Sequence, residues 1–193
     1  MGEFAQAFAA AARLLAALDP ELVGIVGLSL RISLTAVALS ALLALPLGAA
    51  LALLRFPGRS AVVVLLNALM GLPPVVVGLG VYLLLSRAGP LGEYGLLFTP
   101  TAMIVAQAVL VTPLIAALTR QAVADLAAEY GDALPALGAG RARMMVTLLW
   151  EGRVTLLTAV LAGFGRAIAE VGAVIIVGGN IAGHTRVMTT AIA

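Results

Sequence analysis

The residues that could do chemistry in this sequence are few, and two of them form a pair. Arg166 and Glu170 are four residues apart within an apolar stretch, so a helix would place them on one face. Ionisable residues in apolar surroundings are costly, and they either pair with one another or line a path for a charged solute. The pair, which Arg31 could join, is therefore either an internal ion pair that fixes helix packing or part of a path or gate.

A second group is the one long charged segment, residues 119–153. Its charges accompany a helical pattern of apolar residues, and Gly138 and Gly140 interrupt that pattern, which predicts two short helices joined at a glycine turn. Gly138 would allow a close approach or a positive φ at this turn. The hairpin could receive movement from a partner protein, or it could be a solvated loop of no specific use. Its charged residues are Arg120, Asp125, Glu129, Asp132, Arg141, Arg143, Glu151 and Arg153.

A third group follows Gly178 and Gly179 and consists of polar side chains. These residues could dock a partner protein or attract an anion, although a lone histidine is often only a surface residue. Because His184 is the only histidine and cysteine is absent, we expect no metal site. The group is Asn180, His184, Thr185 and Arg186.

The composition indicates lipid as the solvent of the elements that position these groups. The chain has 193 residues, of which 63% are hydrophobic and 10% are charged, whereas soluble domains carry about 25% charged residues. Its mean hydropathy is +1.16. A net charge of +2 is small, and we expect no nucleic-acid partner. All 11 basic residues are arginine, so a phosphate-binding loop that ends in Gly-Lys-Ser/Thr is absent, and any ATP must be hydrolysed on another subunit.

The apolar segments predict an all-α membrane protein. A crossing needs about 20 residues, and spans are expected at about 22–54, 60–86, 100–118 and 154–177. Breaks are expected at residues 71–74 and near Thr112-Pro113, and broken helices at membrane depth pack against protein or line a water-filled path. Pro73 and Pro74 are therefore either a packing kink or part of the path.

The first 18 residues predict an amphipathic helix that lies on the membrane surface, or a plain packing helix, and residues 19–193 form the transmembrane domain. The distribution of arginine predicts the orientation. The turn at 55–59 and the segment 119–153 together hold Arg55, Arg59, Arg120, Arg141, Arg143 and Arg153, and the opposite side holds Arg13, Arg87 and Arg186. We therefore expect residues 119–153 in the cytoplasm and the N-terminus outside the inner membrane.

Several stretches together resemble the permeases of ABC importers. The run Asp132 to Gly138 is similar to the Glu-Ala-Ala-xxx-Gly pattern of their cytoplasmic loop, with Asp in place of Glu and Leu in place of the second Ala. Stronger similarity to the molybdate, tungstate and sulfate permease group, and within it to the tungstate permeases, lies in three runs. These are Phe164-Gly-Arg-Ala-Ile-Ala-Glu-Val-Gly-Ala173, Val177-Gly-Gly-Asn-Ile-Ala-Gly-His-Thr-Arg186 and Val187-Met-Thr-Thr-Ala-Ile192.

The resemblance covers residues 22–193 and implies a type I-like helical core with a cytoplasmic coupling hairpin. It implies a homodimer of permease chains, two ATP-binding cassette subunits that hold ATP and Mg, and an extracytoplasmic oxyanion-binding protein. Asp132, Ala133, Gly138, Arg141 and Arg143 would contact the ATPase, and the polar group at 180–186 would dock the binding protein. The family's final spanning helix is expected to be absent from this sequence. A membrane-embedded enzyme and a purely structural membrane anchor are the alternatives from other functional classes.

Overall fold

The structure is a computed structural model that describes residues 2, 6, 17, 19–130 and 133–193. Within these residues every regular element is helical, which confirms the predicted all-α class. Most of the surface helix predicted over residues 1–18 lies outside the described residues, as does Asp132. The structure describes only Ala133 onward of the predicted motif that begins at Asp132.

The first long helix, α2, runs from Pro20 to Leu53 and has capping groups at both ends. The Asp19 carboxylate accepts hydrogen bonds from the backbone N–H groups of Glu21 and Leu22, at 3.0 and 3.1 Å. At the other end the Arg59 Nε donates to the Leu51 carbonyl oxygen at 2.6 Å. Terminal N–H and C=O groups have no partner within a helix, so these side chains supply one. Arg59 therefore caps the C-terminal end of α2.

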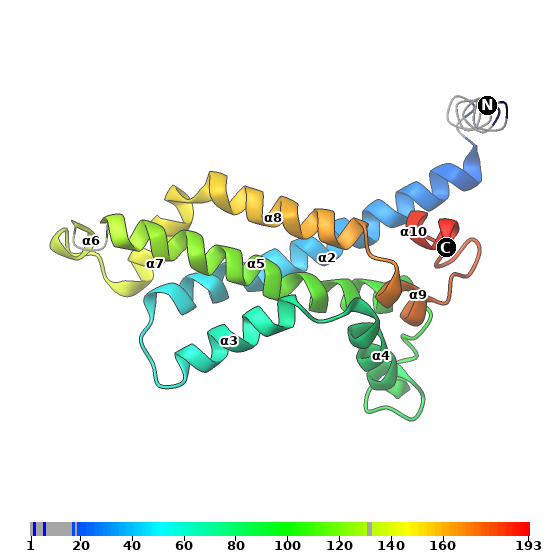
Figure 1. The fold of residues 1–193 in the computed structure, drawn as a ribbon, viewed down its shortest axis with the longest axis horizontal. Helices are drawn as coiled ribbons and strands as arrows, with labels where there is room; N and C mark the ends of the chain where they lie inside the picture. The colour runs from blue at the N-terminus through cyan, green and yellow to red at the C-terminus, as the bar shows by residue number, and fades with distance from the viewer. Residues whose placement is uncertain (1, 3–5, 7–16, 18, 131–132) are drawn as a thin grey trace.

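The second apolar segment is sharply bent. Helices α3 (Arg59–Met70) and α4 (Pro74–Leu85) meet at an angle of 103°, and α4 turns away from the long axis of the bundle (Figure 1). Consecutive prolines remove backbone donors and restrict the chain, which ends α3 here. The structure confirms the predicted break at residues 71–74. The bent pair has the length and composition of one broken crossing or of a re-entrant loop.

The second long helix, α5, differs from the prediction. Helix α5 runs from Pro100 to Tyr130 without interruption at Pro113, and it extends beyond the expected end at Leu118. The Thr112 hydroxyl donates to the Ala108 carbonyl oxygen at 2.7 Å, and the Ser40 hydroxyl of α2 donates to the same oxygen at 3.3 Å. These two hydroxyls bind the carbonyl next to that of Val109, which is the one left without an N–H partner by Pro113. Membrane helices tolerate an internal proline where neighbouring helices pack against it, and Pro113 is buried.

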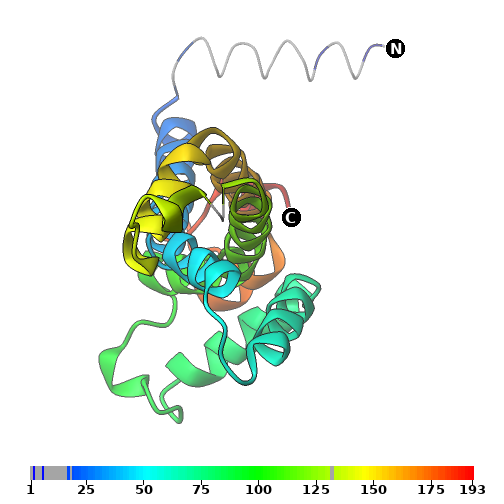
Figure 2. The same ribbon diagram turned by 90° about the vertical axis from the view of Figure 1, so that its left-hand side faces the viewer.

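The remaining helices are shorter. Helix α6 (Ala133–Ala136) precedes α7 (Arg141–Glu151), which joins α8 (Arg153–Ile168) at a bend of 73°. The predicted fourth span is divided between α8 and α9 (Gly172–Gly178), and α10 (Met188–Ile192) follows. A short 3-10 turn covers Gly92–Tyr94. Figure 2, viewed from the end that carries α6 and α7, shows α2, α5 and α8 together and α3 and α4 to one side.

Helices α2 and α5 pack through a seam of small side chains. The seam on α2 is buried and contains Ser33, Ala36, Ser40, Ala44 and Gly48. A Cβ atom at Gly48 would lie 2.6 Å from the Ala116 carbonyl oxygen and 2.9 Å from the Arg120 backbone nitrogen. Small residues let membrane helices approach backbone to backbone, which is what lipid-embedded helices need in order to associate.

Replacing Gly48 by leucine should destabilise the folded chain by about 3 kcal/mol or more, because the new side chain meets backbone that cannot rotate away. Thermal unfolding of the purified protein in detergent measures the effect. Gly80→Ala is the matched control, since a Cβ atom at Gly80 has nothing within 4 Å. Equal melting temperatures for the two variants would contradict the close crossing.

Candidate functional site

Two polar ends face away from each other along the bundle. Figure 1 shows α6, α7 and the turn between α2 and α3 at one end, and the start of α2, α10 and the C-terminus at the other. The two arginine-rich regions, residues 55–59 and 119–153, therefore share an end, as the sequence predicted. The membrane side that each end faces stays a prediction.

Helix α7 fixes the charged hairpin to the bundle through one face. Leu148 is buried in a cluster with Ala49 of α2 and Val123 of α5. Large apolar side chains on the outer surface of the hairpin are exposed, with fractions of 83% for Leu137 and 70% for Trp150. Such side chains are typical anchors of protein interfaces. Sequence analysis selected the charged and glycine residues and missed these two, although large apolar residues in a charged segment are a readable signal.

The predicted coupling residues that the structure describes surround a tight turn. Ala133, Gly138, Arg141 and Arg143 are exposed. Gly138 has φ +77°, a conformation that strains other residues, and its N–H donates to the Pro135 carbonyl oxygen at 2.9 Å. Of the two roles predicted for Gly138, a close approach or a positive φ, the structure shows the positive φ, and a Cβ atom there would have nothing within 4 Å. The turn lets α7 start in a new direction.

Glu170 and Arg166 do not form the ion pair that their spacing in the sequence suggests. Helix α8 ends at Ile168, so Glu170 is not on the same helical face as Arg166. The Glu170 carboxylate is buried and accepts a hydrogen bond from the Ala173 N–H at 3.1 Å. Arg166 is exposed in the last turn of α8. Among the residues that the structure describes, the ion pair present is the one between Arg186 and Glu21.

The structure brings Glu170 close to the break in the second apolar segment. A Cβ atom at Gly172 would lie 3.6 Å from Glu170 Oε1 and 2.8 Å from Val75 Cγ2, and Val75 follows Pro74 in α4. Pro73 is exposed, and its carbonyl oxygen accepts from the N–H groups of the first turn of α4. The starts of α4 and α9 and the Glu170 carboxylate thus lie together.

The polar group near the C-terminus forms a loop closed by its own hydrogen bonds. Thr185 is fully buried, and its hydroxyl donates to the Gly178 carbonyl oxygen at 2.6 Å and accepts from the Ile181 N–H at 2.9 Å. Its side chain therefore supports the loop and is not available on the surface as a docking group. His184 is exposed.

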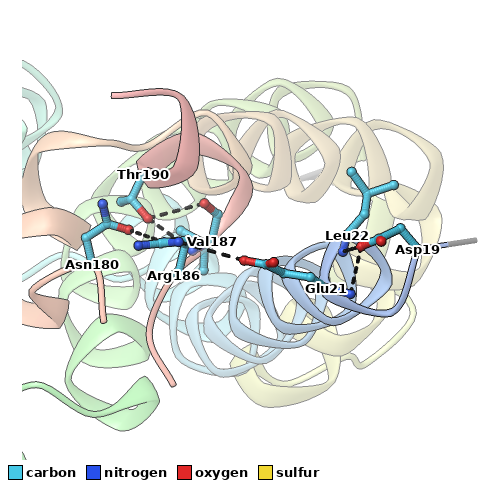
Figure 3. Close-up of polar contacts among 7 residues, drawn as sticks. All are labelled: Asp19, Glu21, Leu22, Asn180, Arg186, Val187 and Thr190. Atoms are coloured by element: carbon cyan, nitrogen blue, oxygen red, sulfur yellow. Dashed lines mark hydrogen bonds and ion pairs between the residues drawn. The ribbon is translucent and has the colours of Figure 1, made fainter. Parts of the chain in front are cut away.

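Arg186 connects this loop to the start of α2. Its guanidinium lies 3.8 Å from the Glu21 carboxylate, and its Nε donates to Asn180 Oδ1 at 3.4 Å (Figure 3). Further along, the Met188 N–H donates to the Ser29 hydroxyl at 2.8 Å. These contacts hold the loop and the first turns of α2 at one end of the molecule.

The chain is 45% identical over 193 residues to the "Tungstate uptake system permease protein TupB" of Peptoclostridium acidaminophilum. The alignment covers 100% of this chain and 85% of that relative. This chain belongs to the anion ABC transporter permease family. A second family member, the "Probable anion ABC transporter permease protein" of Haloferax volcanii, is 46% identical over 176 residues, covering 89% of this chain and 76% of its own length.

A more distant family member is the "Molybdenum transport system permease protein ModB" of Escherichia coli K12. It is 31% identical over 185 residues, which is 90% of this chain and 79% of that protein. No protein-family profile matches the chain. Membership of this permease family and the apolar helices make the protein an integral membrane protein.

Separate roles for the two ionisable residues can be tested by truncating each. Glu170→Ala should lower the free energy of unfolding by about 1–3 kcal/mol, because the buried Ala173 N–H loses its partner. Arg166→Ala should leave it within about 0.5 kcal/mol, as for most exposed positions. Unfolding in detergent measures both. Similar losses of unfolding free energy in the two variants would instead indicate that Arg166 and Glu170 form an ion pair.

Proposed function

We propose that this chain is the permease subunit of an ABC importer that moves tungstate, or a similar tetrahedral oxyanion, into the cell. The observation that carries the proposal is the 45% identity over the whole chain to a permease named for tungstate uptake. Energy comes from ATP, bound with Mg on a separate subunit, because the sequence has no lysine and hence no phosphate-binding loop of its own.

Molybdate is the second candidate substrate, since a permease named for molybdenum transport is 31% identical over 90% of this chain. Sulfate, from the same permease group, is the third. All are tetrahedral dianions, and an extracytoplasmic binding protein would do most of the selection. Competitive uptake of the three anions by cells that express the transporter, together with titration of each against the cognate binding protein, distinguishes them. Preferred uptake of sulfate would overturn the tungstate assignment.

The proposed assembly is a homodimer of this chain in the inner membrane, with two ATP-binding cassette subunits and one binding protein. Residues 119–153 face the cytoplasm, and the N-terminus lies outside. The exposed Arg166 supports a shared path, because an arginine at membrane depth needs water or a partner chain around it. Pro73, Pro74 and Glu170 would form the gate beside it, where the starts of two helices meet.

The hairpin is proposed to receive the ATPase movement. Ala133, Gly138, Arg141 and Arg143, with Asp132 from outside the described residues, would contact the ATPase. The exposed Leu137 and Trp150 supply the apolar anchors that such an interface uses. Because Leu148 fixes α7 against α2 and α5, a displacement of the hairpin would pass directly into the two longest helices.

Gly138→Val should uncouple ATP hydrolysis from uptake while the chain still inserts. A β-branched residue at φ +77° is strained by roughly 1–2 kcal/mol or more, so the turn would change shape. Gly140→Ala is the control, because Gly140 has φ −69° and a Cβ atom there has nothing within 4 Å.

The measurements are tungstate uptake and ATPase activity of the reconstituted transporter. We expect uptake to fall about tenfold or more in Gly138→Val, equivalent to about 1.4 kcal/mol, with ATPase activity retained, and neither to change in Gly140→Ala. Normal uptake by Gly138→Val would show that the hairpin turn is not needed for coupling.

A further inference from the structure

A cavity of about 470 Å³ lies at the end of the molecule opposite the hairpin, between the first turns of α2 and residues 183–186. On α2 its lining includes Gly24, Gly27, Leu28 and Arg31. Gly27 and Leu28 each lie three or four residues from both Gly24 and Arg31, so the four positions form one face of the helix. His184 and Arg186 line the cavity from the loop.

Two glycines create the space. A Cβ atom at Gly24 or at Gly27 would have nothing within 4 Å, so at these two positions α2 meets no other part of the described chain. Elsewhere, at Gly48, Gly78 and Gly163, a Cβ atom would lie under 3 Å from a neighbouring helix. The glycines at the cavity therefore open a volume, whereas those three permit close helix contact.

The charges around the cavity favour an anion. Arg31 is exposed and has no acidic partner among the described residues. The one acidic partner of Arg186 there is the Glu21 carboxylate at 3.8 Å, and its Nε also donates to the neutral Asn180 Oδ1. The Glu21 side chain is 74% exposed, and an exposed pair of this kind is weak. An oxyanion could replace Glu21 as the partner of Arg186, and the planar guanidinium donates to such oxygens in pairs.

We propose that this cavity binds a free tetrahedral oxyanion of the tungstate class on its way into the transporter, with Arg31 and Arg186 as the principal contacts. The proposal rests on the proposed function, because that function supplies the substrate class. Two guanidinium groups opposed by one carboxylate give a site of modest strength. Such a site suits transport, since the solute must leave as readily as it binds.

The absence of cysteine from the chain allows a direct test. Gly27→Cys would place one thiol in the cavity, and Gly80→Cys is the matched control on another open helix face. In the transporter complex purified in detergent, the anionic reagent sulfonatoethyl methanethiosulfonate should react faster at position 27 than at position 80. The cationic reagent aminoethyl methanethiosulfonate should not show that preference. Saturating tungstate should protect position 27 alone.

Removing single charges around the cavity should change the reaction rate at position 27 in opposite directions. Arg31→Gln should slow the anionic reaction at position 27 about fivefold, the factor for one unit charge at about 4 Å in a watery site. Glu21→Gln should accelerate that reaction and lower the tungstate concentration that gives half protection. Arg87→Gln removes an exposed arginine that does not line the cavity and should change neither quantity.

The proposal is overturned if tungstate does not protect position 27 or if Arg31→Gln and Arg87→Gln behave alike. It is also overturned if phosphatidylglycerol added to the detergent micelles protects where soluble tungstate and sulfate do not. The last result would identify a lipid headgroup site. Reaction rates in detergent do not depend on transport. If tungstate does not protect position 27, the proposed function is still decided by the uptake assay. If the cells take up no tungstate, the protection result still stands.

Discussion

Backbone-to-backbone contact between helices is the constraint on which the rest of this structure depends. Lipid gives apolar side chains no reason to prefer one another over acyl chains, so helices must gain from close packing. Gly48 meets the backbone of α5, and Gly78 meets the backbone of Ala173 in α9. Gly163 makes room in the same way for the side chains of Val111 and Ile115 of α5. Bulky apolar residues such as Leu42 and Val154 are left on the outside, where lipid is the natural partner.

This packing separates two kinds of chemistry. The helices joined by small residues carry few ionisable side chains, and most charged residues belong to the start of the chain, the turn at 55–59 and the segment 119–153. One end holds a charged hairpin fixed to α2 and α5 through Leu148, and the other holds a basic cavity beside the first turns of α2. Since α2 reaches both ends, a single helix of about 50 Å joins them.

Much of the fold could be predicted from sequence because local rules decide it. Apolar composition predicted the helical class, and consecutive prolines predicted the break before Pro74. What could not be predicted depends on partners distant in sequence or on where a helix stops. Helix α5 continues through Pro113, and it packs there against α2, whose Ser40 hydroxyl donates to the Ala108 carbonyl oxygen of α5. Glu170 lies past the end of α8, so the spacing rule that pairs it with Arg166 does not apply.

The hydrogen bond between Ser29 and Met188 has a consequence for biosynthesis. It joins residues 159 positions apart in the chain, so helix α2, which is made early, depends on a segment synthesised late. Until that segment arrives, the start of α2 lacks its cover and Glu21 lacks Arg186. Assembly of this end is therefore a late event, and the hairpin end, built from α2, α5 and α7, can be completed before it.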